Sequence, residues 1–141
     1  MKSTIRKNPP RFILLDDDLF ALAFAEKIIR RNDRSAEIIT FSDGKEAIKY
    51  MDTKDFVGKD KDTVFLTDLH MPEIDGFALL DQMENKFMTM KERLHIFVLS
   101  AGACPAEVRK VFSYSYVIGF ISKPFSDHKM EQIIDCIRYP L

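Results

Sequence analysis

The 141-residue sequence has nearly balanced charge, with 21 Lys and Arg, 22 Asp and Glu and a formal net charge of −1, and 46% of its residues are hydrophobic. This size and composition fit a single globular domain with a sizeable core. Because basic residues form no long run, binding to nucleic acid through a basic face is not indicated. No apolar stretch is long enough to span a membrane, and the run Phe12 to Leu15 is too short for a signal peptide. Cys104 and Cys136 lack the spacing of a metal or redox site, so we expect free thiols and a cytoplasmic protein.

The first ten residues end in Pro9-Pro10 and predict a flexible N-terminal arm, which leaves residues 11–141 for the folded domain. Five short apolar runs predict strands at 12–15, 37–41, 64–67, 95–99 and 116–121. A segment with helical spacing of apolar residues follows each run. These segments predict helices at about 19–31, from a cap at Ser42 or Asp43 through Met51, at about 77–87, from Pro105 through Phe112, and over the stripe Met130, Ile133, Ile134 and Ile137.

In the first predicted helix, Phe20, Phe24 and Ile28 recur every four residues, which predicts an apolar stripe packed on the sheet, with Asp18 as the cap. The polar segment from Asp52 to Asp62 predicts an exposed loop. Strands that alternate with helices require parallel pairing and right-handed crossovers. We therefore predict an α/β fold, a doubly wound three-layer sandwich with a five-stranded parallel sheet and five helices.

Polar side chains follow four of the predicted strands at their carboxyl ends. Asp16 and Asp17 follow the first strand, Asp68 the third, Ser100 the fourth and Lys123 the fifth. The carboxyl ends of parallel strands meet at one edge of the sheet, where open α/β folds bind ligands, so we expect these groups to share one pocket. Taken alone, Asp68 is equally well explained as a turn or capping residue. A solvated acidic rim would explain Asp16 and Asp17, but it would leave Ser100 and Lys123 unexplained.

The charges of this cluster predict a bound divalent cation. Two carboxylates about 4 Å apart repel by roughly 4 kcal/mol at an effective dielectric of about 20, and Lys123 alone cannot neutralise three of them. Hard oxygen ligands without a His or Cys cluster favour Mg²⁺. A metal ion, a carboxylate, a hydroxyl and an amine together suit phosphoryl transfer. In that reaction Asp68 would be the nucleophile, and the ion, Ser100 and Lys123 would neutralise the phosphoryl oxygens.

These residues lie in motifs that closely resemble those of the receiver domain of two-component response regulators. The motifs are Leu14-Leu15-Asp16-Asp17-Asp18, the stretch from Thr67-Asp68 to Asp75-Gly76, Leu99-Ser100-Ala101 and Ser122-Lys123-Pro124-Phe125. The resemblance runs from about Arg11 to Arg138. It implies a flavodoxin-like sheet with strand order 2-1-3-4-5. It also implies phosphorylation of Asp68, with Mg²⁺, by a histidine kinase or a histidine phosphotransfer protein.

The resemblance implies a particular set of metal ligands. Asp17, Asp68 and the backbone carbonyl of His70 would bind Mg²⁺ directly, and Asp16 would act through water. His70 occupies a position that varies in the family, two residues after the phosphoacceptor. Gly102, two residues after the switch serine, leaves that position without a side chain. Neither departure removes a required group.

The resemblance also implies how the phosphoryl group is held and sensed. Ser100 and Lys123 would hold it, and the Lys123–Pro124 peptide bond would be cis, which X-Pro bonds tolerate. Ser100 and Phe120, three residues before Lys123, would form a switch. The signal would be read on the face made by the fourth helix, the fifth strand and the fifth helix.

We therefore expect a phosphoacceptor rather than an enzyme, one that assists its own phosphorylation and dephosphorylation. Only Tyr139-Pro140-Leu141 follow Arg138, so the sequence predicts no attached output domain. The expected partners are the phosphate donor and possible downstream protein targets, reached by a monomer or weak homodimer without nucleic acid or membrane.

Three other classes of protein share part of the pattern. A phosphohydrolase with an Asp nucleophile would share the Mg²⁺ site, but it normally has a second acid where this sequence has His70, and it needs a substrate-covering cap. A flavodoxin-type electron carrier would have a Ser/Thr/Gly-rich first loop in place of Asp16 to Asp18. A phosphorylation-independent binding module would be expected to lack Asp17, Asp68 or Lys123, and all three are present.

Overall fold

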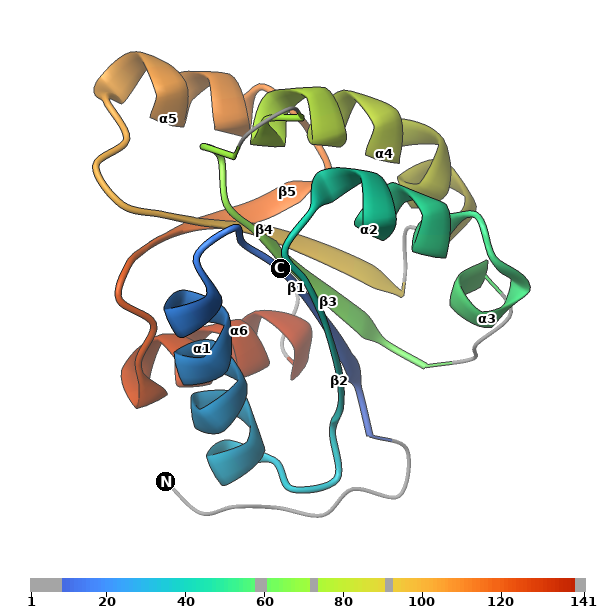
Figure 1. Cartoon of the computed structure of the whole chain (residues 1–141), viewed down its shortest axis with the longest axis vertical. Coiled ribbons are helices and arrows are strands. Elements are labelled where there is room, and N and C mark those ends of the chain that lie inside the picture. Colours follow the sequence, from blue (N-terminus) through green and yellow to red (C-terminus); the bar gives the residue numbers. More distant parts are fainter. Residues whose placement is uncertain (1–8, 58–60, 72–73, 91–92, 139–141) are drawn as a thin grey trace.

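The computed structural model describes residues 9–57, 61–71, 74–90 and 93–138. Five strands form one parallel sheet in the order β2-β1-β3-β4-β5 (Figure 1). They are β1 Arg11–Leu15, β2 Glu37–Phe41, β3 Thr63–Thr67, β4 Leu94–Ser100 and β5 Val117–Ser122. The helices in the described residues are α1 Leu19–Asn32, α2 Gly44–Met51, α3 Lys54–Val57, α4 Gly76–Met90, α5 Pro105–Phe112 and α6 Asp127–Arg138. The predicted fold is confirmed, and the short helix α3 is additional to the five that were predicted.

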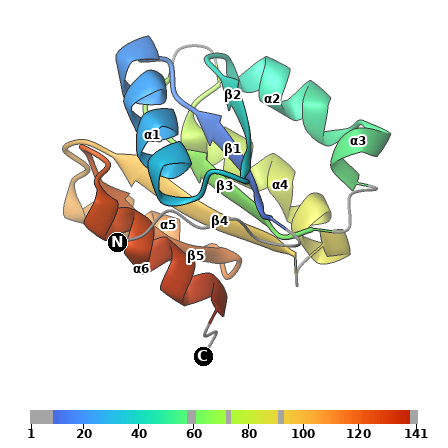
Figure 2. The same cartoon turned by 90° about the horizontal axis from the view of Figure 1, so that it is seen from below.

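Helices cover both faces of the sheet. α1 and α6 lie against one face, and α2, α4 and α5 lie against the other (Figures 1 and 2). In β1, Phe12 and Leu14 pack with α1 and α6, whereas Ile13 and Leu15 pack into the cluster on the opposite face. All four side chains are buried. The predicted first strand is therefore buried on both faces, as is common for a central parallel strand.

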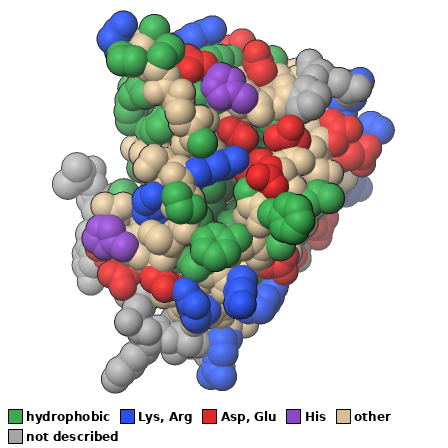
Figure 3. All heavy atoms as spheres, turned by 60° about the vertical axis from the view of Figure 1, so that its left-hand side comes forward, with side chains coloured by type: hydrophobic (Ala, Val, Ile, Leu, Met, Phe, Trp, Pro, Cys, Tyr) green, Lys and Arg blue, Asp and Glu red, His purple; other side chains and the backbone are tan. Residues whose placement is uncertain are grey.

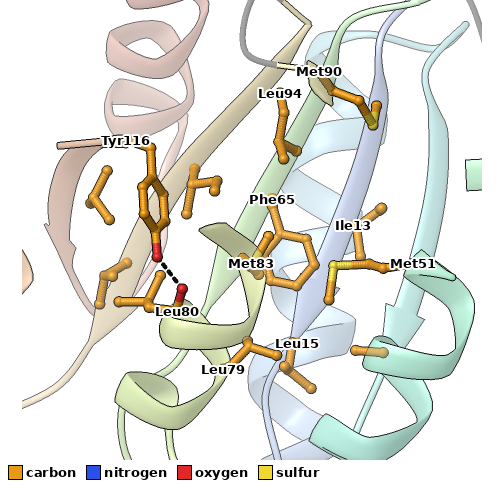
Figure 4. Packing of buried hydrophobic residues seen from close by; sticks show 14 of the residues in the cluster. Ile13, Leu15, Met51, Phe65, Leu79, Leu80, Met83, Met90, Leu94 and Tyr116 are labelled. Carbon is orange, nitrogen blue, oxygen red and sulfur yellow. Dashed lines mark hydrogen bonds between the residues drawn. The ribbon is translucent and has the colours of Figure 1, made fainter. Parts of the chain in front are cut away.

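The core on the α2 and α4 side fixes the position of β5 as well as that of β3. Phe65 of β3 is fully buried among side chains from β1, α2 and α4 (Figure 4). Tyr116, just before β5, is also buried, and its hydroxyl donates a hydrogen bond to the backbone carbonyl of Leu80 in α4. This bond ties the start of β5 to α4, so the far end of β5, where Lys123 follows, is set by the same core.

The orientation of α1 differs from the prediction. Asp18 caps the helix as expected, because its side chain accepts hydrogen bonds from the N–H groups of Phe20 and Ala21. However, Phe20 and Phe24 are 89% and 49% exposed. Residues four apart advance by about 40° around a helix of 3.6 residues per turn, so the row Phe20, Phe24, Ile28 turns from solvent toward the sheet. The predicted stripe was wrong for both phenylalanines, and the buried side consists of Leu22, Ala25, Ile28, Ile29 and Asn32.

The predicted loop from Asp52 to Asp62 is only partly exposed. Residues 54–57 form α3, and Phe56 is fully buried, so the prediction of an exposed loop was wrong there. The cause is Arg11, a buried residue at the start of β1 whose guanidinium lies 5.0 Å from the centre of the Phe56 ring. A buried guanidinium needs partners for its donors. Its hydrogen bonds go to Thr63 Oγ1, the Tyr50 hydroxyl and the backbone carbonyls of Asp55 and Phe56.

Most of the predicted N-terminal arm, residues 1–8, lies outside the described residues. Pro10, its last residue, is buried, and its carbonyl accepts a hydrogen bond of 3.2 Å from the N–H of Glu37. In the described part of the chain, none of the helices is both long and apolar enough to cross a bilayer.

Candidate functional site

β3 delivers Asp68 to the carboxyl end of the sheet, directly after Thr67. Asp68 is 7% exposed, and its N–H donates a hydrogen bond of 3.0 Å to the carbonyl of Leu15 in β1. Its carboxylate oxygen Oδ1 accepts a hydrogen bond from the N–H of Leu69 (2.7 Å). The other oxygen, Oδ2, accepts one from Nζ of Lys123 (3.0 Å). The carboxylate is therefore oriented from both sides, by its own loop and by the loop after β5.

β1 supplies two further acids at the same edge. Asp16 is 5% exposed, and its Oδ1 accepts a hydrogen bond of 2.9 Å from the N–H of Asp18. Asp17 is exposed to solvent. One oxygen from each of Asp16, Asp17 and Asp68 can be chosen so that all three lie within 4.8 Å of one another. Figure 3 shows acidic side chains gathered beside a basic one on this side of the molecule. The predicted convergence of these acids is thus observed.

Lys123 connects the two buried acids. Its Nζ lies 2.5 Å from Oδ2 of Asp16 and 3.0 Å from Oδ2 of Asp68. Its backbone N–H donates a hydrogen bond of 3.1 Å to the carbonyl of Ser100, which ties the loop after β5 to the end of β4. The Lys123–Pro124 peptide bond is cis, as the family resemblance implies. A single ammonium therefore serves as counter-ion to both carboxylates.

The protonation of this cluster reflects burial as well as charge. Burial raises the pKa of Asp16, and the hydrogen bonds from Lys123 and from the N–H of Asp18 reverse only part of that rise. Burial alone would lower the pKa of Lys123, but its hydrogen bonds with Asp16 and Asp68 and their negative charges outweigh burial and raise it. Lys123 is therefore a permanent cation at neutral pH.

Ser100 ends β4 with a side chain that lacks a hydrogen-bond partner. Ser100 is 1% exposed, and its Oγ has no partner among the described residues. A buried hydroxyl without a partner typically costs about 1–3 kcal/mol. The hydroxyl lies at the sheet edge that carries Asp68 and Lys123, because β4 pairs with both β3 and β5. An oxygen-rich ligand bound at this edge would give Ser100 the acceptor that it lacks.

His70 forms a contact that the sequence analysis did not predict. Its Nε2 lies 3.2 Å from Oε2 of Glu107 in α5, and both side chains are partly exposed. The Glu107 carboxylate also accepts a hydrogen bond from the N–H of Cys104. That bond, together with the charge of His70, lowers the pKa of Glu107. The bond between Glu107 and the Cys104 N–H could have been predicted from the sequence, because a Glu at the third position of a helix commonly caps it, but the contact with His70 could not.

Two glycines shape the loops around the site. A Cβ on Gly76 would lie 2.6 Å from the carbonyl oxygen of Asp68 and 2.7 Å from Cα of Leu69, so no other residue fits without moving Asp68. Gly102, after β4, has a φ of 71°, in the left-handed region that favours glycine. No atom lies within 4 Å of where its Cβ would be. Pro72, part of the same motif as Asp68, lies outside the described residues.

Phe120, the predicted switch residue, does not touch the acids in the contacts described here. It is partly buried and packs against the core on the α4 and α5 side. It pairs with Val98 of β4, two residues before Ser100. The pairing of β4 and β5 is irregular at Ile96 and Phe97, one residue before this pair. Phe120 therefore lies on β5 next to the strand that ends in Ser100, three residues before Lys123.

The donor set fits a small divalent cation. Three carboxylates provide hard oxygen ligands, and the described residues near them bring no Cys or His side chain into the cluster. The exposed Asp17 leaves room for water molecules, which Mg²⁺ usually retains. Together with a buried hydroxyl and a fixed ammonium, this arrangement can neutralise the oxygens of a phosphoryl group next to a carboxylate.

A parallel sheet with the strand order β2-β1-β3-β4-β5, with acids, a hydroxyl and a lysine at one edge, is the arrangement found in signalling receiver domains. Residues 12–135 match the family model described as response regulator receiver domain. The chain therefore belongs to this family, and it is a receiver domain of the two-component response regulator type.

Individual proteins are similar to the chain in sequence or in fold. The chain is 27% identical over 135 residues to the probable methanogenesis regulatory protein FilR2 of Methanothrix harundinacea, covering 92% of this chain and 82% of that protein. It has the fold of a response regulator receiver protein from Dyadobacter fermentans, with a TM-score of 0.80, 22% identity and coverage of 92% and 98% of the two chains. A two-component response regulator from Cytophaga hutchinsonii gives a TM-score of 0.78 at 22% identity, with 94% and 98% covered.

Proposed function

We propose that this receiver domain accepts a phosphoryl group on Asp68, with Mg²⁺, from a histidine kinase or a histidine phosphotransfer protein. The observation that carries the proposal is the fixed Asp68–Lys123 contact beside a buried Ser100 hydroxyl without a described partner. A phosphoryl group on Asp68 would present oxygens to both side chains. This would relieve the cost of the unpaired hydroxyl in the phosphorylated state.

In the proposed reaction Asp68 is the nucleophile. One of its oxygens forms a bond to phosphorus, while the bond between phosphorus and the donor's imidazole nitrogen breaks and leaves its electron pair on that nitrogen. The N–H of Leu69 and the ammonium of Lys123 hold the carboxylate in one orientation before attack. Lys123 and the Ser100 hydroxyl then donate to phosphoryl oxygens, which stabilises the charge that develops there.

Mg²⁺, when bound, would neutralise both the clustered acids and the phosphoryl oxygens. Asp17, Asp68 and the backbone carbonyl of His70 would ligate the ion, and Asp16 would reach it through water. Asp17 is exposed, which gives the ion a route from solvent. Asp16 is instead buried against Lys123, which suits an indirect role.

We further propose that the chain acts by contact rather than as an enzyme that releases a product. Its output surface would be the face of α5, β5 and α6, with Ser100 and Phe120 as the switch. Phe112 at the end of α5 and Ile118 in β5 are 52% and 42% exposed and offer apolar contact area there. The partner would be a downstream protein or the next member of a phosphorelay, bound by a monomer or weak homodimer.

Free thiols at the exposed Cys104 and Cys136 suit the cytoplasm.

The proposal is tested by incubating the protein with acetyl phosphate and Mg²⁺ and measuring the intact mass. We expect the wild-type protein to gain one phosphoryl group and Asp68→Asn to gain none. Asp43→Asn is the matched control, because Asp43 is not one of the three acids that come together at the site, and as the cap of α2 it can be replaced by Asn, which caps a helix equally well. Labelling of Asp68→Asn at the wild-type level would refute the assignment.

A further inference from the structure

Lys129 lies in the first turn of α6, and its ammonium contacts the backbone on both sides of Lys123. Its Nζ donates hydrogen bonds to the carbonyl oxygens of Ser122 (2.6 Å) and Pro124 (2.9 Å). A third, longer bond of 3.4 Å goes to the Ser122 hydroxyl. An ammonium has three donors, and these three acceptors account for all of them. Lys129 therefore bridges the two neighbours of the lysine that contacts Asp68.

The location of Lys129 opposes the dipole of its own helix. Its N–H donates a hydrogen bond to Oγ of Ser126 (3.2 Å), and the N–H of Met130 donates to the Ser126 carbonyl (2.9 Å). Ser126 is thus the helix cap, and Lys129 is the third residue after it. A cation in the first turn is unfavourable, because the helix dipole is positive there. Bonds to two loop carbonyls, which carry partial negative charge, offset this cost and direct the side chain toward the loop instead of along the helix.

The start of α6 is anchored, so Lys129 can act as a fixed support. Met130 is fully buried in the core between α6 and the sheet. The carboxylate of Asp127 accepts hydrogen bonds from Asn32 (2.7 Å) and Arg31 (2.6 Å) of α1. The three hydrogen bonds of the Lys129 ammonium therefore connect the loop after β5 to the start of α6, which is held by the core and by α1.

Lys123 is itself held at its backbone and at its tip. Its N–H is bonded to the Ser100 carbonyl on the inner side of the loop, and its Nζ contacts Asp16 and Asp68. Lys129 restrains the same loop through the backbone carbonyls of Ser122 and Pro124, the residues before and after Lys123. Without it, the loop could move outward and carry the Lys123 ammonium with it.

We propose that Lys129 is a positioning residue that sets where the Lys123 ammonium lies relative to Asp68. The proposal rests on the proposed function, in which Lys123 holds the phosphoryl group. Lys129 does not touch that group and acts only through the backbone of Ser122 and Pro124. Because transfer depends on the exact placement of charge around phosphorus, Lys129 affects the rate of phosphoryl uptake. The metal ligands on the loops after β1 and β3 are left in place.

The test measures the rate of phosphoryl uptake from acetyl phosphate in the presence of Mg²⁺. Lys129→Met keeps the aliphatic stem and removes the charge and its three hydrogen bonds, and we expect uptake to slow by about three- to tenfold, the factor that corresponds to the loss of about one hydrogen bond from a displaced Lys123. Lys129→Arg, which can donate to the same carbonyls, should restore at least half of the lost rate. Lys27→Met on the exposed face of α1 is the control and should match the wild-type protein.

A double-mutant comparison separates positioning from a general structural effect. In a Lys123→Met background, Lys129→Met should cause no further slowing, because there is no ammonium left to position. The affinity for Mg²⁺ and the melting temperature should change little in either background. Equal slowing with and without Lys123, or wild-type uptake by Lys129→Met, would overturn the proposal.

A failure of the proposed function would give a different result, since the wild-type protein itself would then gain no phosphoryl group. In that case the positioning is still measured by NMR of the Lys123 side chain. Lys129→Met should shift the Cε and Hε signals of Lys123, whereas Lys27→Met should not. Unchanged Lys123 signals in Lys129→Met would overturn the positioning role independently of any phosphorylation.

Discussion

Lys123 and the three aspartates make the site a compact set of charges with more negative than positive groups. Asp16 and Asp68 share the Lys123 ammonium, whereas Asp17 extends into solvent beside them. A carboxylate that lacks its own counter-ion raises the free energy of the ion-free protein through repulsion. The stability of this domain should therefore depend on both the cation and Asp17.

We expect Mg²⁺ to raise the melting temperature of the wild-type protein, since an ion that binds only the folded state stabilises it by about 2.7 kcal/mol at about 100 times its Kd. Asp17→Asn should bind the ion more weakly and, without the ion, melt at a higher temperature than the wild-type protein. Thermal unfolding with EDTA and with Mg²⁺ measures both effects, and Asp43→Asn is the control. An ion-free Asp17→Asn protein that melts lower than wild type would contradict the repulsion.

The contact between His70 and Glu107 holds an imidazole two residues after Asp68, on the loop that follows β3. If Asp68 is phosphorylated as proposed, a His70 side chain held by Glu107 would limit the approach of the water that hydrolyses aspartyl phosphate. We expect His70→Ala to lose its phosphoryl group roughly threefold faster, since an exposed ion pair contributes about 0.2–1 kcal/mol. Glu107→Gln keeps an acceptor for the Cys104 N–H and should shift the rate in the same direction. Decay measured between pH 5.5 and 8 would show slower loss in His70→Ala if the imidazole instead acts as a base.

At the scale of elements, the link between α1 and α6 depends on a charged side chain. Hydrogen bonding from Asn32, reinforced by Arg31, lowers the pKa of Asp127. A carboxyl group with a lower pKa in the folded state stabilises the protein above its unfolded pKa, and this contribution is lost as the pH falls through the folded value. The contribution is therefore present at pH 7 and disappears in strong acid.

We expect Asp127→Asn to melt at a lower temperature than the wild-type protein at pH 7. The difference should shrink as the pH falls below about 4, the unfolded pKa of Asp. Asp135→Asn, on the exposed side of the same helix, should not reproduce this loss. Melting curves recorded from pH 7 to pH 2.5 provide the measurement. A difference between Asp127→Asn and wild type that is constant across this range would show that the carboxylate charge is not responsible.

Sequence patterns predicted the elements better than the surroundings of single side chains. Continuous apolar runs located the strands, and the polar residues that end them identified the shared edge, because parallel strands all end there. The two exposed phenylalanines of α1 were misplaced because apolar character does not distinguish a core face from a free one. The burial of Arg11 and Phe56 was missed because it depends on hydrogen bonds between distant segments. For the same reason, the contacts of Lys129 and the contact between His70 and Glu107 became evident only in three dimensions.

For the molecule as a whole, the sheet joins the site around Asp68 to the α5–β5–α6 face. Ser100 ends β4, and β5 beside it carries Phe120, whose ring is partly buried. If Ser100 moves toward a phosphoryl group, Phe120 can fill the space that is vacated. This would change the outer surface of β5 and α5 at a distance from the chemistry.

We therefore expect phosphorylation to change the NMR chemical shifts of residues 105–125 as well as those of the site loops. Phe120→Ala should keep the changes at the loops and lose most of those on the α5–β5–α6 face. Asp68→Asn treated with acetyl phosphate and Mg²⁺ is the control and should show neither set. Chemical-shift changes confined to the loops in the phosphorylated wild-type protein would mean that this face does not respond to phosphorylation of Asp68.

The buried Arg11 has a consequence for how the protein can be engineered. Its guanidinium binds the carbonyls of Asp55 and Phe56, so the surface segment that carries α3 is attached to the first strand. A tag or a fluorescent domain spliced between these two residues would leave buried donors of Arg11 unsatisfied, although the position looks like an ordinary surface connection. A reporter joined at the end of α6 would avoid this, since the helix ends there without taking part in that network.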